Sequence, residues 1–177
     1  MSSIVLRKAK NEDLEEFIQM RIAIQKHVEK SDPGEWRFSD EGIVAVRKEI
    51  RLRLESKMCF LGVAETSTGK IAGMVMAEIV KNYGVVPELY GHIHWLYVKE
   101  PARRHGIGRK LIQFTSDFFA SWGVEFVTVG YVVDNPEAAA FWPSMGFRNR
   151  VMHSFITRDK LSNVSENTTD NGNDKLD

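Results

Sequence analysis

A short basic segment with two glycines is the part of this sequence whose residue types most clearly suggest chemistry. It follows an apolar stretch, precedes a helical pattern and consists of Arg103, Arg104, His105, Gly106, Ile107, Gly108 and Arg109. The first peptide N–H groups of a helix lack intrahelical partners and bind anions well. Glycine leaves such backbone accessible to a bulky phosphate, and clustered cations suit a polyphosphate. The segment therefore predicts a phosphate-binding turn, with a plain tight turn and solvated cations as the alternative.

Two histidines form a second candidate group. His92 and His94 stand two residues apart in an expected strand, so their side chains should share a face. Histidine, with an ordinary pKa of about 6.5, exchanges protons near neutral pH. Tyr131, which ends a later strand-like segment, and Tyr97 are further proton donors, although alternation places Tyr97 on the face opposite the histidines. All four residues are equally compatible with ordinary packing and hydrogen bonding, and no third ligand suggests a metal site.

The hydrophobic pattern predicts one mixed α/β domain that would position these residues. We expect strands at residues 3–9, 58–65, 71–80, 92–98, 124–131 and 147–158, and helices at 11–30, 41–56, 108–123 and 136–145. The helix at 108–123 crosses between two of the strands, which implies that these two strands are parallel. The polar segment 162–177 is expected to be a disordered tail, which leaves residues 1–161 as the domain.

Composition and charge exclude several function classes. The 177 residues carry zero formal net charge, which argues against binding nucleic acid or an anionic membrane by bulk attraction. The apolar runs are too short for a membrane span or a signal peptide. The one cysteine, Cys59, excludes an internal disulfide, and its apolar strand context favours packing over a nucleophilic role. We expect a soluble, cytoplasmic protein.

Two stretches of the sequence resemble the GNAT superfamily of N-acetyltransferases. Arg103-x-x-Gly106-x-Gly108 after an apolar strand resembles the acetyl-CoA diphosphate motif of that family, Gln/Arg-x-x-Gly-x-Gly/Ala. Further along, Asn135 precedes an expected short helix and Gly146-Phe147 opens the expected last strand, which is similar to the family's later segment. The order of elements is similar too, and the resemblance covers roughly residues 4–157.

The resemblance implies a mostly antiparallel sheet whose parallel fourth and fifth strands splay apart to form a slot for acetyl-CoA. The amides from Arg104 to Arg109 would hold the diphosphate, and Asn135 would bind the arm of the co-substrate or order the slot. The backbone that would pair with the pantetheine arm belongs to Leu96, Tyr97 and Val98.

The resemblance also bears on catalysis. His92 and His94 resemble a His-x-His pair that helps relay the amine's proton in arylalkylamine N-acetyltransferases. Trp142 departs from the family pattern, because many members carry there the tyrosine that protonates the leaving thiolate. Indole lacks useful acidity, so another group or solvent must supply that proton.

Two functions are compatible with these features. One is an acetyl-CoA-dependent N-acetyltransferase that moves an acetyl group to a primary amine by direct attack in a ternary complex. The other is a non-catalytic acetyl-CoA-binding sensor or interaction module of the same fold. The acceptor, a small molecule or a protein amino group, stays open, as does the oligomeric state, a homodimer included. The residues considered for the acceptor side lie in two loops: Asp32, Glu35, Trp36, Asp40, Glu41, Tyr83, Glu88 and Tyr90.

Overall fold

The computed structural model of the protein describes residues 3–31, 37–39, 41–151, 153–154 and 156–163. The chain divides into two compact units, Met1–Met145 and Gly146–Asp177. The first unit contains the sheet and all the candidate catalytic and cofactor-binding residues named above. The second unit contains one short helix, α6 (Arg158–Asn163).

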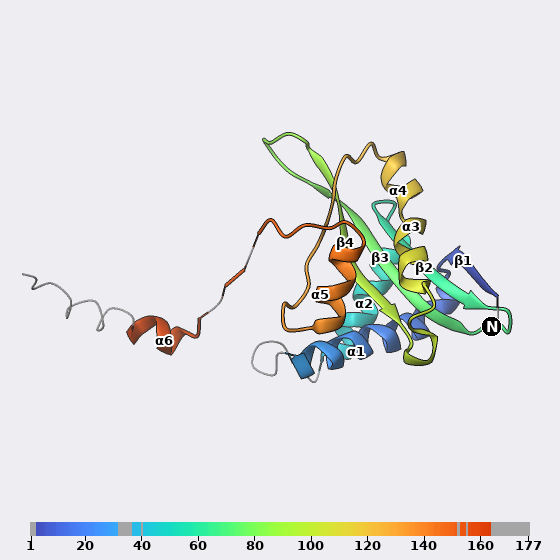
Figure 1. Ribbon diagram of the computed structural model, residues 1–177, viewed down its shortest axis with the longest axis horizontal. Coiled ribbons are helices and arrows are strands. Elements are labelled where there is room, and N and C mark those ends of the chain that lie inside the picture. The colour runs from blue at the N-terminus through green and yellow to red at the C-terminus, as the bar shows by residue number, and fades with distance from the viewer. Residues whose placement is uncertain (1–2, 32–36, 40, 152, 155, 164–177) are drawn as a thin grey trace, which may run out of the picture. The chain divides into compact units, whose positions relative to one another are not determined.

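A five-stranded sheet forms the centre of the first unit (Figure 1). Its strands lie in sequence order and are β1 (Ile4–Lys8), β2 (Cys59–Thr66), β3 (Ile71–Lys81), β4 (Leu89–Val98) and β5 (Val127–Val129). The pairs β1–β2, β2–β3 and β3–β4 are antiparallel, whereas the pair β4–β5 is parallel. The predicted mixed, mostly antiparallel sheet with a parallel fourth and fifth strand is therefore confirmed.

The parallel pair is short. β5 pairs with β4 only at Gly91–Val127, His92–Thr128 and Ile93–Val129. From His94 to Val98, β4 continues beside β3 but has no β5 partner in the described part of the chain. The two strands thus separate after Ile93, and the backbone of β4 beyond that point is available on one side.

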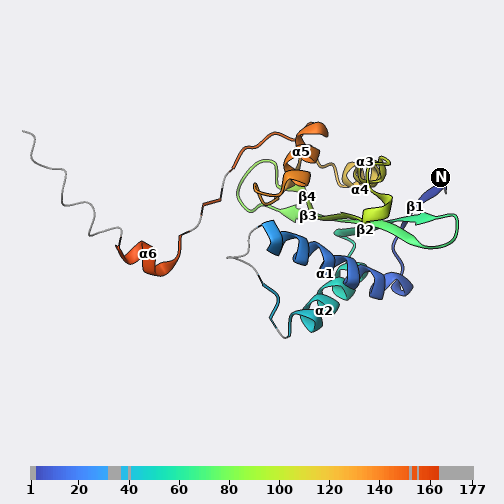
Figure 2. The same cartoon turned by 60° about the horizontal axis from the view of Figure 1, so that its bottom comes forward.

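Helices cover both faces of the sheet. Figure 2 shows α1 and α2 on one face and α3, α4 and α5 on the other. The bounds of the helices, including the two short 3₁₀ turns η1 and η2, are η1 (Asn11–Asp13), α1 (Leu14–Ser31), α2 (Gly42–Glu55), η2 (Glu100–Ala102), α3 (Ile107–Phe114), α4 (Ser116–Ser121) and α5 (Pro136–Ser144). The chain passes from β4 through α3 and α4 to β5, which is the crossover that a parallel pair requires.

Apolar side chains on both faces hold the helices in place. On the α1/α2 face, Phe17, Ile18 and Ile50 are buried against Met74 and Met76 of β3. On the other face, a Cβ on Gly91 would lie 2.5 Å from the ring of Phe119, so α4 approaches β4 closely because this position has no side chain. Burial of this apolar surface is the main source of stability for such a layered fold.

Three predicted elements differ from the structure. The helix predicted at 108–123 is divided at the buried Thr115, whose hydroxyl donates to the carbonyl of Ile112 at 2.7 Å. The strand predicted at 124–131 is limited to Val127–Val129. The final strand predicted at 147–158 does not form in the residues described there, because no neighbouring strand pairs with them. The predicted tail lies mostly outside the described residues, and the domain boundary at residue 161 stays a prediction.

Candidate active site

The turn that precedes α3 has an unusual backbone conformation. Gly106, the N-cap of α3, is left-handed with φ 75°, and Arg104 two residues earlier has φ 61°. Backbone that combines left-handed residues with a helix start directs successive N–H groups toward one point, which makes an anion-binding concavity. A Cβ on Gly106 would meet no atom within 4 Å, so the space beside these amides is open. The backbone therefore fits a diphosphate.

The side chains of this turn have different surroundings. Arg104 and His105 are exposed, whereas the buried Ile107 anchors the start of α3 in the core. A Cβ on Gly108 would lie 3.4 Å from the ring of Phe141, an ordinary contact distance, so this position needs a small residue but tolerates more than glycine. The start of α3 is thus held between the sheet and α5 while its exposed face keeps the positive charge.

Two arginines of the motif bind other parts of the protein. Arg103 donates through Nε to the carbonyl of Val98 at 3.0 Å, and its Nη1 contacts both carboxylate oxygens of Glu137 at 2.9 and 3.0 Å. Arg109 donates to the carbonyl of Ser144, the last residue of α5, at 3.2 Å. Both contacts join the turn to α5, so these two side chains have a structural use in addition to any ligand.

The backbone predicted to pair with the pantetheine arm lies in the separated stretch of β4. Leu96, Tyr97 and Val98 all belong to the five residues without a β5 partner. Leu96 lies 3.8 Å from where a Cβ on Gly108 would stand, which brings this backbone next to the anion-binding turn. Part of this backbone is already used. The Val98 carbonyl accepts from Arg103. The Lys99 N–H donates to the Ala72 carbonyl of β3 at 2.8 Å, so antiparallel alternation directs the N–H and C=O of Tyr97 toward β3 as well.

Asn135 is the N-cap of α5, and Trp142 lies within this helix. The Asn135 side chain accepts hydrogen bonds from the backbone N–H groups of Glu137 and Ala138 at 3.1 and 3.2 Å, so it caps the helix. Trp142 is buried and packs edge-on against Phe141, with ring centroids 5.1 Å apart. The two roles expected for Asn135, binding the arm of the co-substrate or ordering the slot, stay predictions.

His92 and His94 lie against each other. Their ring centroids are 4.4 Å apart with an interplanar angle of 80°. His92 Nδ1 lies 2.7 Å from the hydroxyl of Thr128 on β5, and His94 Nε2 lies 2.7 Å from a carboxylate oxygen of Glu78 on β3. Tyr131 is half-buried and stands two residues beyond the end of β5.

A bulge in β4 changes which side chains share a face. Trp95 pairs with Met76 and Ile93 pairs with Ala77, so His94 is one extra residue in β4. Such a bulge interrupts the alternation of side chains. Tyr97 therefore packs in the α1/α2 core with Trp95, on the same face as the histidines. The prediction that Tyr97 faces away from them is wrong, because it assumed a regular strand.

A cluster of charged residues surrounds His94. The carboxylate oxygen of Glu78 that contacts His94 also accepts from Arg53 Nη1 at 2.8 Å, and Arg53 Nε donates to Glu49 at 3.1 Å. The Arg53 guanidinium lies 5.6 Å from the ring centre of Trp95. The pair Arg53–Glu78 thus links α2 to the bulge in β4.

Burial and charge shift the pKa values in this cluster. Burial, followed by the charge of neighbouring His94, lowers the pKa of His92. Burial and the Arg53 charge lower the pKa of His94, although the hydrogen bond to Glu78 opposes the shift. Burial raises the pKa of Glu78, but the hydrogen bond and charge of Arg53 outweigh it and the net shift is downward. At neutral pH the carboxylate is therefore ionised and both imidazoles are neutral.

Comparison with models of known families identifies the family of this chain. The model of the Acetyltransferase (GNAT) family matches residues 21–147, which include both the turn and the histidine pair. The chain belongs to this family. The resemblance seen in the sequence is therefore confirmed, and the first unit is a GNAT domain. Among curated proteins, none matches the chain significantly.

Solved structures of the same fold are similar to this GNAT domain at low sequence identity. A mutant of the BH1408 protein from Bacillus halodurans has a TM-score of 0.77 and 18% identity, covering 86% of this chain and 99% of that one. Glucosamine-6-phosphate N-acetyltransferase from Arabidopsis thaliana has a TM-score of 0.63 and 23% identity, covering 89% and 99%. The aminoglycoside N-acetyltransferase AAC(6')-Iy, in complex with CoA, has a TM-score of 0.68 and 18% identity, covering 89% and 96%.

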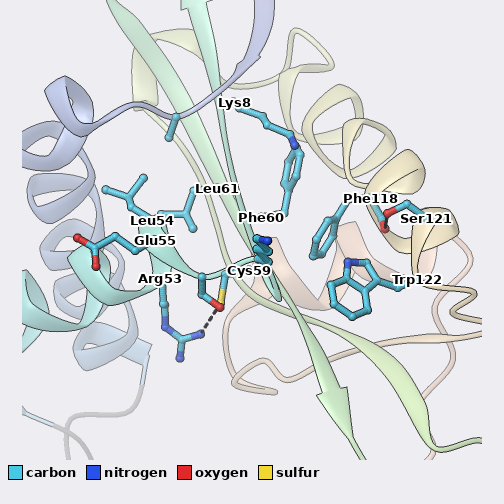
Figure 3. A pocket seen from close by; sticks show the side chains of 13 residues that line it. Lys8, Arg53, Leu54, Glu55, Cys59, Phe60, Leu61, Phe118, Ser121 and Trp122 are labelled. Atoms are coloured by element: carbon cyan, nitrogen blue, oxygen red, sulfur yellow. Dashed lines mark hydrogen bonds between the residues drawn. The ribbon is translucent and has the colours of Figure 1, made fainter.

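A pocket of about 470 Å³ lies elsewhere in the GNAT domain, between the end of β1, the end of α2, the start of β2 and α4 (Figure 3). None of its lining residues belongs to the turn before α3 or to α5. Cys59, half-buried in β2, lines this pocket and lies 3.9 Å from Arg53 Nη1, as Figure 3 shows. Of the residues that line this pocket, Arg53 bonds to the carboxylate of Glu78, and Cys59 is the cross-strand partner of Glu78 in the pairing of β2 with β3.

The predicted acceptor-side residues are only partly brought together. Tyr83 is 84% exposed, and Tyr90 stacks on Phe126 with ring centroids 6.1 Å apart. Glu41 and Glu88 are exposed, whereas Asp32, Glu35, Trp36 and Asp40 lie outside the described residues. Within the described part of the GNAT domain and α6, no group of three His, Cys, Asp or Glu side chains could hold a metal ion. No helix in those residues has the length and apolar content to cross a membrane.

Sequence reasoning missed Glu78, Arg53 and Thr128. Glu78 carries a signal in retrospect, because it is the one charged residue within the apolar run from Ile71 to Val80. A carboxylate in such a run needs a partner, since an unpaired buried charge is costly. Arg53 and Thr128 carry no comparable signal, because their contacts depend on how α2 and β5 pack.

Proposed function

We propose that this protein is an acetyl-CoA-dependent N-acetyltransferase that moves an acetyl group to a primary amine by direct attack in a ternary complex. The observation that carries the proposal is the turn at Gly106, because within a GNAT domain it offers an open cluster of backbone N–H groups next to separated strand backbone. Similar structures include a glucosamine-6-phosphate N-acetyltransferase and an aminoglycoside N-acetyltransferase, which agrees with an amine acceptor.

Acetyl-CoA would bind through backbone more than through side chains. The amides of Ile107, Gly108 and Arg109 lie in the first turn of α3 and have no intrahelical acceptor, so they would donate to the diphosphate. Arg104 and His105, both exposed, would add positive charge. The N–H groups of Leu96 and Val98 and the carbonyl of Leu96, which face away from β3, would pair with the pantetheine arm.

The amine must lose a proton for transfer to occur. Its nitrogen forms a bond to the thioester carbonyl carbon, the carbon–sulfur bond breaks, and the sulfur leaves as a thiolate. His94 or His92, both neutral at neutral pH, would accept the proton that the amine loses. The thiolate would take a proton from Tyr131 or from solvent, because Trp142 is buried and has no acidic proton.

A substrate panel tests the proposal. Thiol release from acetyl-CoA is followed with aminoglycosides, amino sugars and their phosphates, arylalkylamines, polyamines and peptides with a free amino terminus. Calorimetry measures acetyl-CoA affinity in parallel. We expect acetyl-CoA to bind and at least one amine class to accelerate thiol release by a factor of about 100 or more over buffer, as positioned proton transfer and proximity would give. Tight binding without transfer to any class would favour the sensor function, which the Trp142 position also suggests.

A further inference from the structure

The hydrogen bonds of Thr128 determine the tautomer of His92. The Thr128 hydroxyl has one proton and donates it to the carbonyl of Gly91, with an oxygen–oxygen distance of 3.2 Å. A carbonyl only accepts, so this contact uses the hydroxyl proton. The 2.7 Å contact between Thr128 Oγ1 and His92 Nδ1 must then have the imidazole as donor. In the neutral ring, Nε2 of His92 consequently carries the lone pair.

The carboxylate of Glu78 determines the opposite tautomer of His94. Arg53 donates to Glu78 Oε2 at 2.8 Å, and this charge contributes to the lowered pKa of Glu78. An ionised carboxylate only accepts, so His94 Nε2, at 2.7 Å from the same oxygen, must donate. In the neutral ring, Nδ1 of His94 carries the lone pair.

We propose that Thr128 and Glu78 hold the histidine pair in opposite tautomers, with His92 Nε2 and His94 Nδ1 as the two proton-accepting atoms, and that Glu78 is the positioning residue of the transfer reaction. The tautomers follow from the contacts alone, whereas the role in transfer rests on the proposed function. When Nδ1 of His94 accepts the proton of the amine, Glu78 stabilises the imidazolium through the existing Nε2–H hydrogen bond. Arg53 opposes that stabilisation, so this ion pair tunes His94 as a base.

Several charged groups besides Glu78 surround His94. Arg53 and Glu49 belong to α2, His92 neighbours it on β4, and Arg21 of α1 lies 5.2 Å from the ring centre of the adjacent Trp95. Two of these groups bond to each other, since Glu49 accepts from Arg53. Glu78 is the one that bonds directly to the imidazole in the described part of the chain. Changing it should therefore affect His94 most.

Nitrogen NMR of the histidine rings tests the tautomers without any substrate. Uniformly ¹⁵N-labelled protein contains five histidines, and His92→Gln and His94→Gln variants assign the two signals of interest. We expect the Nδ1–H form for His92 and the Nε2–H form for His94 at neutral pH. Thr128→Val removes the acceptor of the His92 Nδ1–H, so His92 should no longer be held in the Nδ1–H form. Thr128→Ser keeps a hydroxyl there and should preserve that form. The opposite tautomer at either ring, or a Thr128→Val spectrum identical to wild type, would overturn the assignment.

Variants of Glu78 test its positioning role. The amide oxygen of Glu78→Gln can still accept from His94, so the tautomer should persist while the pKa of His94 falls, because the negative charge is gone. We expect kcat to fall by about tenfold or more with KM and acetyl-CoA affinity near wild type, and the pH profile to move to lower pH. Arg53→Met should move the profile to higher pH.

Glu65→Gln is the matched control. Glu65 is also a half-buried strand carboxylate bonded to an arginine, Arg7, but it lies in β2 away from the histidines. It should leave the pH profile unchanged. An unshifted His94 titration in Glu78→Gln would overturn the positioning role. The NMR readings do not depend on an acceptor, so failure of the proposed transfer reaction and failure of this inference are distinguished.

Discussion

Arg103 Nε donates a hydrogen bond to the backbone carbonyl of Val98 at 3.0 Å. The same guanidinium pairs with Glu137 in the first turn of α5. The arginine that opens the phosphate motif thus fixes the end of β4 and the start of α5 relative to the turn. Its charge is already paired, so the diphosphate site depends mainly on backbone geometry.

This relationship predicts the effect of changing Arg103. Glutamine can replace the donor to Val98, so Arg103→Gln should weaken acetyl-CoA binding by no more than about fivefold, or roughly 1 kcal/mol. Arg103→Met keeps the length of the side chain but cannot donate, and should weaken binding further and lower the melting temperature. Calorimetry and thermal unfolding of both variants check this. Equal loss of affinity in both would mean that Arg103 acts by its charge on the ligand.

Gly106→Glu should abolish measurable acetyl-CoA binding, because the new carboxylate would place negative charge in the open space beside the amides of α3. Gly123→Glu is the matched control. Gly123 is also left-handed with open space around it, but it follows α4. Both variants should lose about 1 kcal/mol of stability from backbone strain, and only the first should lose binding. Unchanged affinity in Gly106→Glu would remove the turn as the phosphate site.

The pH dependence of transfer should report the protonation of the half-buried pair His92 and His94. Both have a pKa below the ordinary histidine value, and only the neutral ring accepts a proton. Activity should therefore be retained at neutral pH and lost as pH falls through a midpoint below that ordinary value. The double variant His92→Gln with His94→Gln should lower turnover by about 100-fold and lose this limb of the profile. Full activity with the same profile would exclude the relay.

Asn135 should matter through the helix that it caps. Asn135→Ala removes the acceptor for two backbone N–H groups and should cost about 1 kcal/mol of unfolding free energy. Asn135→Asp retains that acceptor and should be near wild type in denaturant titrations. A loss of acetyl-CoA affinity in the Asp variant at unchanged stability would instead indicate that the amide contacts the ligand directly.

The ion pair of Asp13 with Arg7 should make stability depend on acid. Asp13 is buried, and accepts from Arg7 at 2.7 and 3.0 Å and from the N–H of Lys10 at 2.7 Å. Burial raises the pKa of Asp13, but these hydrogen bonds outweigh it and the net shift is downward. The carboxylate therefore stabilises the fold above its unfolded-state pKa, and this contribution disappears as pH falls through its lower folded-state value.

Asp13→Ala should accordingly reduce the unfolding free energy by roughly 2–3 kcal/mol at neutral pH. The difference from wild type should shrink as the solution is acidified. Urea titrations at several pH values measure it, with the exposed neighbour Glu12→Ala as control. A difference that stayed constant with pH would assign the loss to packing instead of charge.

Much of the fold followed from local patterns in the sequence. The apolar pattern predicted α1, α2, β2 and β3 to within a few residues. The two helices each bury one face, whereas β2 and β3 are covered on both faces and read as nearly continuous apolar runs. The turn before α3 was predictable from its glycines and arginines, since their conformational and electrostatic properties are local. The last predicted strand, at 147–158, does not form in the residues that the structure describes there, because a strand exists only where another strand pairs with it.

The histidine site was predictable only in part. The spacing of His92 and His94 indicated a shared face, and they do lie together. Their partners Glu78 and Thr128 come from two other strands, so the contacts depend on register. The bulge at His94 depends on the same register, and it is the reason that simple alternation misplaced Tyr97.

The stretch of β4 from His94 to Val98 also has a consequence for the solubility of the protein. An unpaired strand edge is a template for edge-to-edge association of sheets between molecules. Arg103 shortens the unprotected length by engaging the Val98 carbonyl, but the backbone before it stays open on the side where β5 has separated. An extended ligand that pairs along this edge would act as a removable protecting strand. Ligand-free protein should therefore self-associate more readily than ligand-bound protein. Its solubility should increase with the concentration of ligand.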